Sequence, residues 1–168
     1  MRYLGNKESI LTEISDLLES QGLLKDGFSF FDAFCGSGSV SDYFKSYYDI
    51  IINDNLTWSV KYAKGRVRAL TCTFDKLGFD PFEYLNANEN TVQGFMYRNY
   101  SPTESARMYF TSENAGRIDY FRNQIEDWKN ENLLSEEEYC YLITCLIESV
   151  SDVSNTAGVY GAFLNKRL

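Results

Sequence analysis

The chain has 168 residues, of which 44% are hydrophobic and 16% aromatic, and its formal net charge at pH 7 is −8. This length and apolar content suffice for one globular domain and exclude intrinsic disorder, while the acidic balance argues against a self-sufficient nucleic-acid binder, which usually carries a basic face. No apolar run reaches the roughly 18 residues of a membrane span, and the first residues lack a secretory pattern, so the sequence predicts a cytoplasmic protein.

The first elements of the chain are predicted to be a helix, a strand and a second helix. Apolar residues recur at helical spacing over residues 6–18. Residues 28–34 read as a strand that is short and apolar enough to be covered on both faces. The glycines of 36–38 then form a turn, and a helix is expected to run through residues 40–44.

A second strand and a third helix follow. Residues 48–52 are rich in β-branched side chains, which predicts another buried strand. After it, Thr57 can cap a helix that keeps its apolar spacing to Leu70, although Gly65 weakens this prediction. The alternation over residues 1–70 predicts a parallel α/β sheet. The basic residues of the third helix are expected on a solvated face: Lys61, Lys64, Arg66 and Arg68.

Residues 71–168 are predicted to be rich in loops and mainly helical. The part from 71 to 111 has no clear period and contains both prolines, so at most one short helix is expected there. Apolar side chains at helical spacing predict a helix over residues 118–128. Ser135 and Glu138 form a capping box that opens a further helix. The final segment of the chain has no distinct pattern.

The stretch "DAFCGSGSV", residues 32–40, joins the first strand to its helix through a glycine-rich turn. Such a turn lets a ligand approach the backbone and aims amide N–H groups at it. Asp54 follows Gly36 by 18 residues and ends the next strand, where its carboxylate can accept hydrogen bonds from ribose hydroxyls. The combination predicts a nucleoside-containing cofactor. Because a dinucleotide fingerprint would have a third glycine where this chain has Ser41, pyrophosphate binding is disfavoured.

Three segments resemble the opening motifs of a known family. "RYLGNK" (2–7), "DAFCGSGSV" (32–40) and "NDN" (53–55) look like those of the Dam-like, or alpha-group, adenine-N6 DNA methyltransferases. Residues 109–128 and 155–166 also resemble a subset of that family, whose members belong largely to restriction–modification systems and use S-adenosyl-L-methionine. The resemblance implies a partial Rossmann-like methyltransferase fold, with a cofactor-binding α/β portion at 1–70 and a helical continuation at 71–168.

The resemblance also implies a cofactor site. The lysine of the first motif, here Lys7, would lie near the methionine carboxylate, the second motif would form the floor and an amide cradle, and Asp54 would hold the ribose. The predicted site comprises Tyr3, Gly5, Lys7, Asp32, Phe34, Gly36, Ser37, Gly38, Asp54 and Asn55. No residue of this chain is expected to be catalytic.

The catalytic motif of the family, Asp-Pro-Pro-Tyr or a close variant, has no counterpart in this sequence. The two prolines, Pro81 and Pro102, are not adjacent, and "DPFEY" at 80–84 is the nearest stretch. In the family the motif follows segments like 155–166, so we expect the chain to be an amino-terminal portion, inactive by itself, of an enzyme that acts on double-stranded DNA. Weak or no DNA binding is expected for this chain alone.

A parallel sheet that lacks further strands would have an unpaired edge and an uncovered apolar face. Self-association, or pairing with a carboxyl-terminal half, is therefore expected. Two alternatives stay open: a dinucleotide-binding oxidoreductase fragment, and a non-enzymatic acidic interaction module.

No metal site or disulfide framework is expected. The chain has no histidine, and its four cysteines lack CxxC spacing. The absence of histidine also excludes the usual Ser-His and Cys-His nucleophiles. Burial as small hydrophobic side chains is the predicted role of Cys35, Cys72, Cys140 and Cys145.

Overall fold

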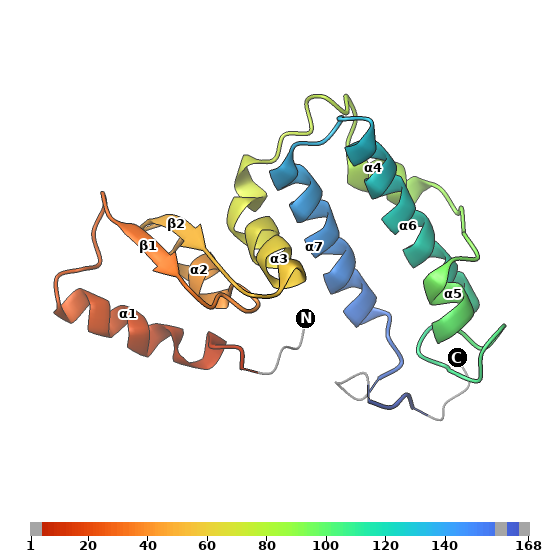
Figure 1. Ribbon diagram of the computed structural model, residues 1–168, viewed down its shortest axis with the longest axis horizontal. Coiled ribbons are helices and arrows are strands. Elements are labelled where there is room, and N and C mark those ends of the chain that lie inside the picture. The colour runs from red at the N-terminus through yellow and green to blue at the C-terminus, as the bar shows by residue number, and fades with distance from the viewer. Residues whose placement is uncertain (1–4, 157–160, 165–168) are drawn as a thin grey trace.

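Two short parallel strands form the only named sheet in the residues that the computed structural model describes, 5–156 and 161–164. Strand β1 (Ser29–Asp32) and strand β2 (Asp49–Ile52) are joined by helix α2 (Ser39–Phe44). Figure 1 shows the sheet at one end of the molecule, with a group of helices extending from it. The described chain is thus α/β with a two-stranded parallel sheet and a mainly helical second half, as predicted.

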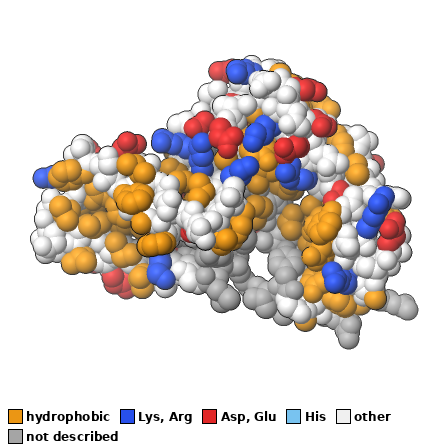
Figure 2. Space-filling view, in the orientation of Figure 1, with side chains coloured by type: hydrophobic (Ala, Val, Ile, Leu, Met, Phe, Trp, Pro, Cys, Tyr) orange, Lys and Arg blue, Asp and Glu red, His pale blue; other side chains and the backbone are white. Residues whose placement is uncertain are grey.

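Within the described residues, only one face of this sheet is covered. On the inner face, Phe30 stacks on Phe44 of α2 at 5.5 Å between ring centroids, and its register partner Ile50 is buried. On the other face Phe31 is 61% exposed and its partner Ile51 is 51% exposed. Successive side chains of a strand alternate between the two faces of the sheet, so these exposed residues mark one uncovered face. The prediction that both strands are covered on two faces is therefore wrong. Apolar side chains gather on the surface at this end of the molecule (Figure 2).

The amino-terminal helix is present but buries little. A 3₁₀ turn at Glu8–Ile10 leads into α1 (Leu11–Ser20), as the apolar spacing predicts. No residue of α1 is buried, and Leu17 is largely exposed. The apolar stripe of this helix therefore lacks a full partner among the described residues.

Two long helices pack closely at the centre of the molecule. They are α3 (Thr57–Arg68) and α7 (Glu136–Asp152), and α7 lies between α3 and α6 in Figure 1. A Cβ on Gly65 would lie 2.3 Å from Thr144 Oγ1 and 2.4 Å from the Cys140 carbonyl oxygen. The glycine that weakens the helix prediction locally is thus the residue that lets the two backbones approach.

The start of α3 differs from its prediction. Thr57 is the first residue of the helix and not its cap, and the capping position, Leu56, makes no side-chain cap hydrogen bond. Instead, Asp54 Oδ1 accepts a hydrogen bond from the Leu56 N–H at 3.0 Å. An aspartate that bonds the backbone two residues on is a common turn former, and it competes here with the threonine.

The region from 71 to 111 contains two short helices, where at most one was expected. After a 3₁₀ turn (Ala69–Thr71) come α4 (Pro81–Ala87) and α5 (Phe95–Tyr100). Helix α4 has a local start signal, because Asp80 accepts hydrogen bonds from the N–H groups of Phe82 and Glu83. Helix α5 is capped instead from a distant helix, since the buried carboxylate of Asp119 accepts from its first turn at 3.0 and 2.8 Å.

The two predicted carboxyl-terminal helices are confirmed. Helix α6 (Ser112–Asn130) contains the predicted apolar positions, and α7 begins with the predicted capping box. The Ser135 hydroxyl accepts from the Glu138 N–H at 3.2 Å, and the Glu138 carboxylate accepts from the Ser135 N–H at 2.8 Å. Buried side chains of these two helices form most of the larger core cluster, which consists of Leu77, Leu85, Ile125, Trp128, Leu134, Tyr139, Cys140 and Leu142.

The cysteines agree in part with their prediction. Cys35 and Cys140 are buried, Cys72 and Cys145 are half-buried, and all four are free thiols. Burial raises the pKa of the Cys35 thiol to about 11, with the Asp32 and Asp54 carboxylates adding to the effect. The thiol therefore stays protonated at neutral pH and is not an activated nucleophile.

None of the described helices combines the length and the apolar character that crossing a bilayer requires.

Candidate functional site

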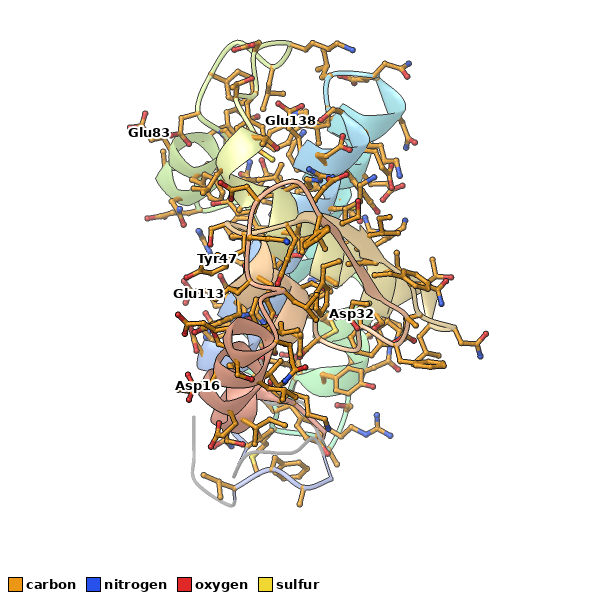
Figure 3. All side chains as sticks on the ribbon, turned by 90° about the vertical axis from the view of Figure 1, so that its left-hand side faces the viewer. Asp16, Asp32, Tyr47, Glu83, Glu113 and Glu138 are labelled. Carbon is orange, nitrogen blue, oxygen red and sulfur yellow. The ribbon has the colours of Figure 1, made fainter. Side chains whose placement is uncertain are left out.

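A cavity of about 420 Å³ opens where both strands end at their carboxyl termini. Three segments that are distant in the sequence line it, and each comes from one of the motifs of the sequence analysis. The lining residues are Gly5, Asn6, Lys7, Asp32, Phe34, Cys35, Gly36, Ser37, Ser39, Val40 and Asp54. Asp32, at the end of β1, is labelled in Figure 3.

Most of the predicted site residues lie around this one cavity. They are Gly5, Lys7, Asp32, Phe34, Gly36, Ser37 and Asp54. Gly38 and Asn55 do not line the cavity, and Tyr3 lies outside the described residues. Four lining residues were missed, namely Asn6, Cys35, Ser39 and Val40. All four lie within the motifs at residues 2–7 and 32–40. Taking every residue of each motif as a candidate would therefore have included them.

Gly38 serves the packing of two helices. Its φ is +70°, and a Cβ placed on it would lie 2.6 Å from Ala63 Cβ on α3. Both the left-handed backbone and the lack of space require glycine at this position. The structure thus gives Gly38 a role between α2 and α3, away from the cavity lining.

Backbone hydrogen bonds extend the pairing of the strands to the edge of the cavity. The Asn53 N–H donates to the Asp32 carbonyl oxygen at 2.9 Å, and the Cys35 N–H donates to the Asn53 carbonyl oxygen at 2.9 Å. The Asn53 side-chain amide donates to the Ala33 carbonyl oxygen at 2.9 Å. These bonds hold the second and third motifs side by side.

Asp54 ties the third motif to the glycine turn. Its Oδ2 accepts a hydrogen bond from the Gly36 N–H at 3.0 Å, while its Oδ1 accepts from the Leu56 N–H. The hydrogen bond from the Leu56 N–H has the largest effect and that from the Gly36 N–H the second largest, and together they hold the pKa of Asp54 below its usual range. The carboxylate is therefore ionised at neutral pH, as a hydrogen-bond acceptor in this position must be.

The glycine turn uses two of its own amides internally. The Gly36 N–H donates to Asp54, and the Gly38 N–H donates to the Cys35 carbonyl oxygen at 2.7 Å. These two N–H groups are thus committed to protein acceptors, although an amide cradle for a ligand was expected here. The carbonyl of Gly36 is also bonded, to the Ser59 hydroxyl of α3.

Side chains on α2 and α3 hold the rest of the cavity wall. The buried Ser41 hydroxyl donates to Asp32 Oδ2 at 2.7 Å, at the position where a dinucleotide fingerprint has glycine. Arg66 donates to Asp42 at 2.9 Å and to the Ser37 carbonyl oxygen at 3.2 Å. Lys64 pairs with Glu137 at 3.6 Å. Arg66 is therefore bound to the cavity wall, where a solvated position was predicted, whereas Lys64 makes its ion pair at the surface.

Phe34 stands at the rim with its ring free of close packing. Its side chain is 88% exposed, although it lies only two residues beyond the end of β1. Lys7 also lines the cavity, and its ammonium donates to the Gly5 carbonyl oxygen at 3.0 Å. The cavity thus combines an aromatic ring, one cation and two carboxylates, which is the donor and acceptor set that a zwitterionic nucleoside would need.

The segment "DPFEY" lies elsewhere. It begins α4, and its Asp80 is occupied as the cap of that helix. It contributes no residue to the cavity lining. This placement agrees with a structural role for the segment.

Comparison with known proteins adds an independent finding. Residues 3–168 match the family model of the D12 class N6 adenine-specific DNA methyltransferases. The chain is 41% identical to modification methylase LlaI of Lactococcus lactis subsp. lactis over 170 residues, and 38% identical to type II methyltransferase M.FokI of Planomicrobium okeanokoites over 172 residues. It is 34% identical to type II methyltransferase M.NlaIII of Neisseria lactamica over 173 residues.

These alignments cover 97–98% of the chain but only part of each relative. The chain spans 27% of the length of LlaI, 26% of M.FokI and 49% of M.NlaIII. No solved structure matches.

Proposed function

The chain belongs to the D12 class of N6 adenine-specific DNA methyltransferases, and from this premise we propose that it is the S-adenosyl-L-methionine-binding part of such an enzyme. We further propose that residues 1–70 bind the cofactor in a partial Rossmann-like arrangement and that 71–168 continue the same domain. This membership replaces the alternative of a dinucleotide-binding oxidoreductase.

The observation that carries the proposal is the convergence of three motifs on one cavity. Gly5 and Lys7 come from the first motif, Ser37 from the second and Asp54 from the third. Ligand clefts of open α/β sheets lie beyond the carboxyl ends of the strands, as this cavity does. Its volume of about 420 Å³ falls within the roughly 300–1,000 Å³ of small-molecule pockets.

The charges in the cavity fit the proposed cofactor. The Lys7 ammonium would pair with the cofactor carboxylate, and the ionised Asp54 would accept hydrogen bonds from the ribose hydroxyls. Asp32, held by Ser41, adds a second negative charge beside a ligand that carries a sulfonium centre. When bound, the cofactor would supply an activated methyl group, and the residues of this chain would bind and orient it.

Transfer to adenine needs groups that this sequence does not contain. The family's Asp-Pro-Pro-Tyr motif, which holds the target amine and stacks on the flipped base, is absent from the 168 residues. We propose that the chain alone has no methyltransferase activity and that DNA is a partner only of the complete enzyme. Incubation with unmethylated plasmid and labelled cofactor should give no incorporation. Incorporation above that of an Asp54→Ala control would contradict this proposal.

Isothermal titration calorimetry tests cofactor binding directly. We expect S-adenosylmethionine and its product S-adenosylhomocysteine to bind the wild-type chain, and Asp54→Ala to weaken both by at least about tenfold, since a hydrogen bond to a charged group contributes about 1.5–3 kcal/mol. Asp49→Asn, at the exposed start of β2, is the matched control. Absence of binding to the wild-type chain would favour the acidic interaction module.

A further inference from the structure

A chain of hydrogen bonds runs through four polar side chains of the cavity wall. Ser37 Oγ lies 2.9 Å from Ser39 Oγ, and Ser39 Oγ lies 2.6 Å from Asn6 Oδ1. Arg66 Nη1 reaches the same Ser39 Oγ at 3.4 Å. Both serines are buried, and Asn6, Ser37 and Ser39 all line the cavity.

The proton of each hydroxyl in this chain can be assigned from its neighbours. The backbone N–H of Glu8, which can only donate, meets Asn6 Oδ1 at 3.1 Å, so that this atom must be the carbonyl oxygen. The single proton of Ser39 therefore goes to Asn6. Because the guanidinium of Arg66 also only donates, Ser39 Oγ is left to accept the bond from Ser37.

The proton of the Ser37 hydroxyl is thus directed toward Ser39 and away from the cavity. Any further hydrogen bond of Ser37 Oγ is one that it accepts. A ligand group that only donates, such as an ammonium, is matched to this oxygen, whereas a carboxylate would meet its lone pairs. A ribose hydroxyl can donate or accept, so it would gain little from this fixed polarity.

We propose that Ser37 Oγ accepts a hydrogen bond from the α-ammonium of the amino-acid end of the cofactor, and that Asn6 and Ser39 are positioning residues that fix its polarity. This inference rests on the proposed function. Asn6 is adjacent to Lys7, whose ammonium is the cation in the same lining segment. The two charged groups of one α-amino acid would then meet complementary partners, the carboxylate at Lys7 and the ammonium at Ser37.

The test compares two probes, S-adenosylhomocysteine and its analogue in which hydrogen replaces the α-amino group, titrated calorimetrically into the full chain. We expect the wild type to prefer the amino compound by about tenfold. Ser39→Ala removes the acceptor of the Ser37 proton, and Asn6→Ala frees the Ser39 proton to point back at Ser37. Both variants should reduce this preference to about threefold or less, mainly by weakening the amino compound.

Ser101→Ala is the matched control, because Ser101 is a buried serine that bonds the Tyr97 carbonyl oxygen of α5 and does not line the cavity. It should keep the wild-type preference. Asn6 is only half-buried, so its variant serves if Ser39→Ala unfolds, which far-ultraviolet circular dichroism would reveal.

The outcomes separate the two proposals. An unchanged preference in both variants, with normal binding of S-adenosylhomocysteine, would overturn the role of Ser37 and leave the cofactor site in place. A wild-type chain that binds neither probe would overturn the proposed function, and this inference with it.

Discussion

The carboxylate of Asp54 accepts a hydrogen bond from the N–H of Gly36 at 3.0 Å, which joins the end of β2 to the glycine turn that follows β1. The same carboxylate bonds the Leu56 N–H and so shapes the start of α3. One side chain thus holds the turn of the proposed cofactor site and the helix entry behind it. Substitutions of Asp54 should therefore affect both binding and stability.

Asp54→Asn should lower the free energy of unfolding at neutral pH, because an amide can accept only one of the two N–H bonds. The pKa of Asp54 is depressed in the folded chain, so its contribution is complete above the ordinary aspartate value of about 3.9 and is lost as the pH falls through the folded value. Urea unfolding at pH 7, 5 and 3 should show the difference from wild type shrinking only at the lowest pH. A difference that is equally large at all three would refute the assignment.

Gly65→Ala should destabilise the chain by about 1–3 kcal/mol, the usual cost of overpacking. The new methyl group would meet Thr144 Oγ1 and the backbone carbonyl of Cys140, and the backbone of α7 cannot move aside cheaply. Urea unfolding measures the loss. Lys64→Ala, the neighbouring position with a 3.6 Å ion pair at the surface, should cost less than about 1 kcal/mol. Equal effects of the two substitutions would contradict close packing at Gly65.

Glu138→Gln should destabilise by about 1–3 kcal/mol, because its carboxylate accepts from both the Phe74 N–H at 2.6 Å and the Ser135 N–H. Burial raises the pKa of Glu138, but the bonds from Ser135 and Phe74 outweigh burial and lower the pKa below its ordinary value. The difference from wild type should therefore fade in acid, as the pH falls through the folded pKa.

Glu137→Gln is the control for that measurement. Glu137 makes an ion pair with Lys64 at the surface, so that its loss should change the free energy of unfolding by less than about 1 kcal/mol. If Glu138→Gln lowered the free energy of unfolding no more than Glu137→Gln does, the hydrogen bond between the Phe74 N–H and Glu138 of α7 would not be a stabilising contact.

The exposed face of the sheet should drive association. We expect sedimentation of the chain to depend on concentration, and the double substitution Phe31→Thr and Ile51→Thr to shift it toward monomer, because these paired side chains form an uncovered apolar patch on β1 and β2. Leu70→Ser removes an even more exposed apolar residue outside the sheet and should have little effect. A wild-type chain that sediments as a monomer at high concentration would count against the patch as an interface.

The sequence by itself determined the elements whose signals are local. The capping box of α7, the apolar spacing of α6 and the two short strands each follow from residues within or next to the element itself. The grouping of Lys7, Ser37 and Asp54 around one cavity was implied by the family resemblance of their motifs and not by any local signal. Hydrogen bonds between near neighbours and the periodicity of apolar side chains depend only on the local order of residues, so the sequence is enough to predict them.

Only the tertiary structure decided what depends on distant partners. Asp119 caps α5 from α6, Gly65 is required by α7, and Gly38 is required by Ala63, and none of these contacts has a local signal. The same reason explains the one-sided sheet. Which face of a strand is covered depends on where helices pack, and packing is chosen by shape and burial across the whole chain.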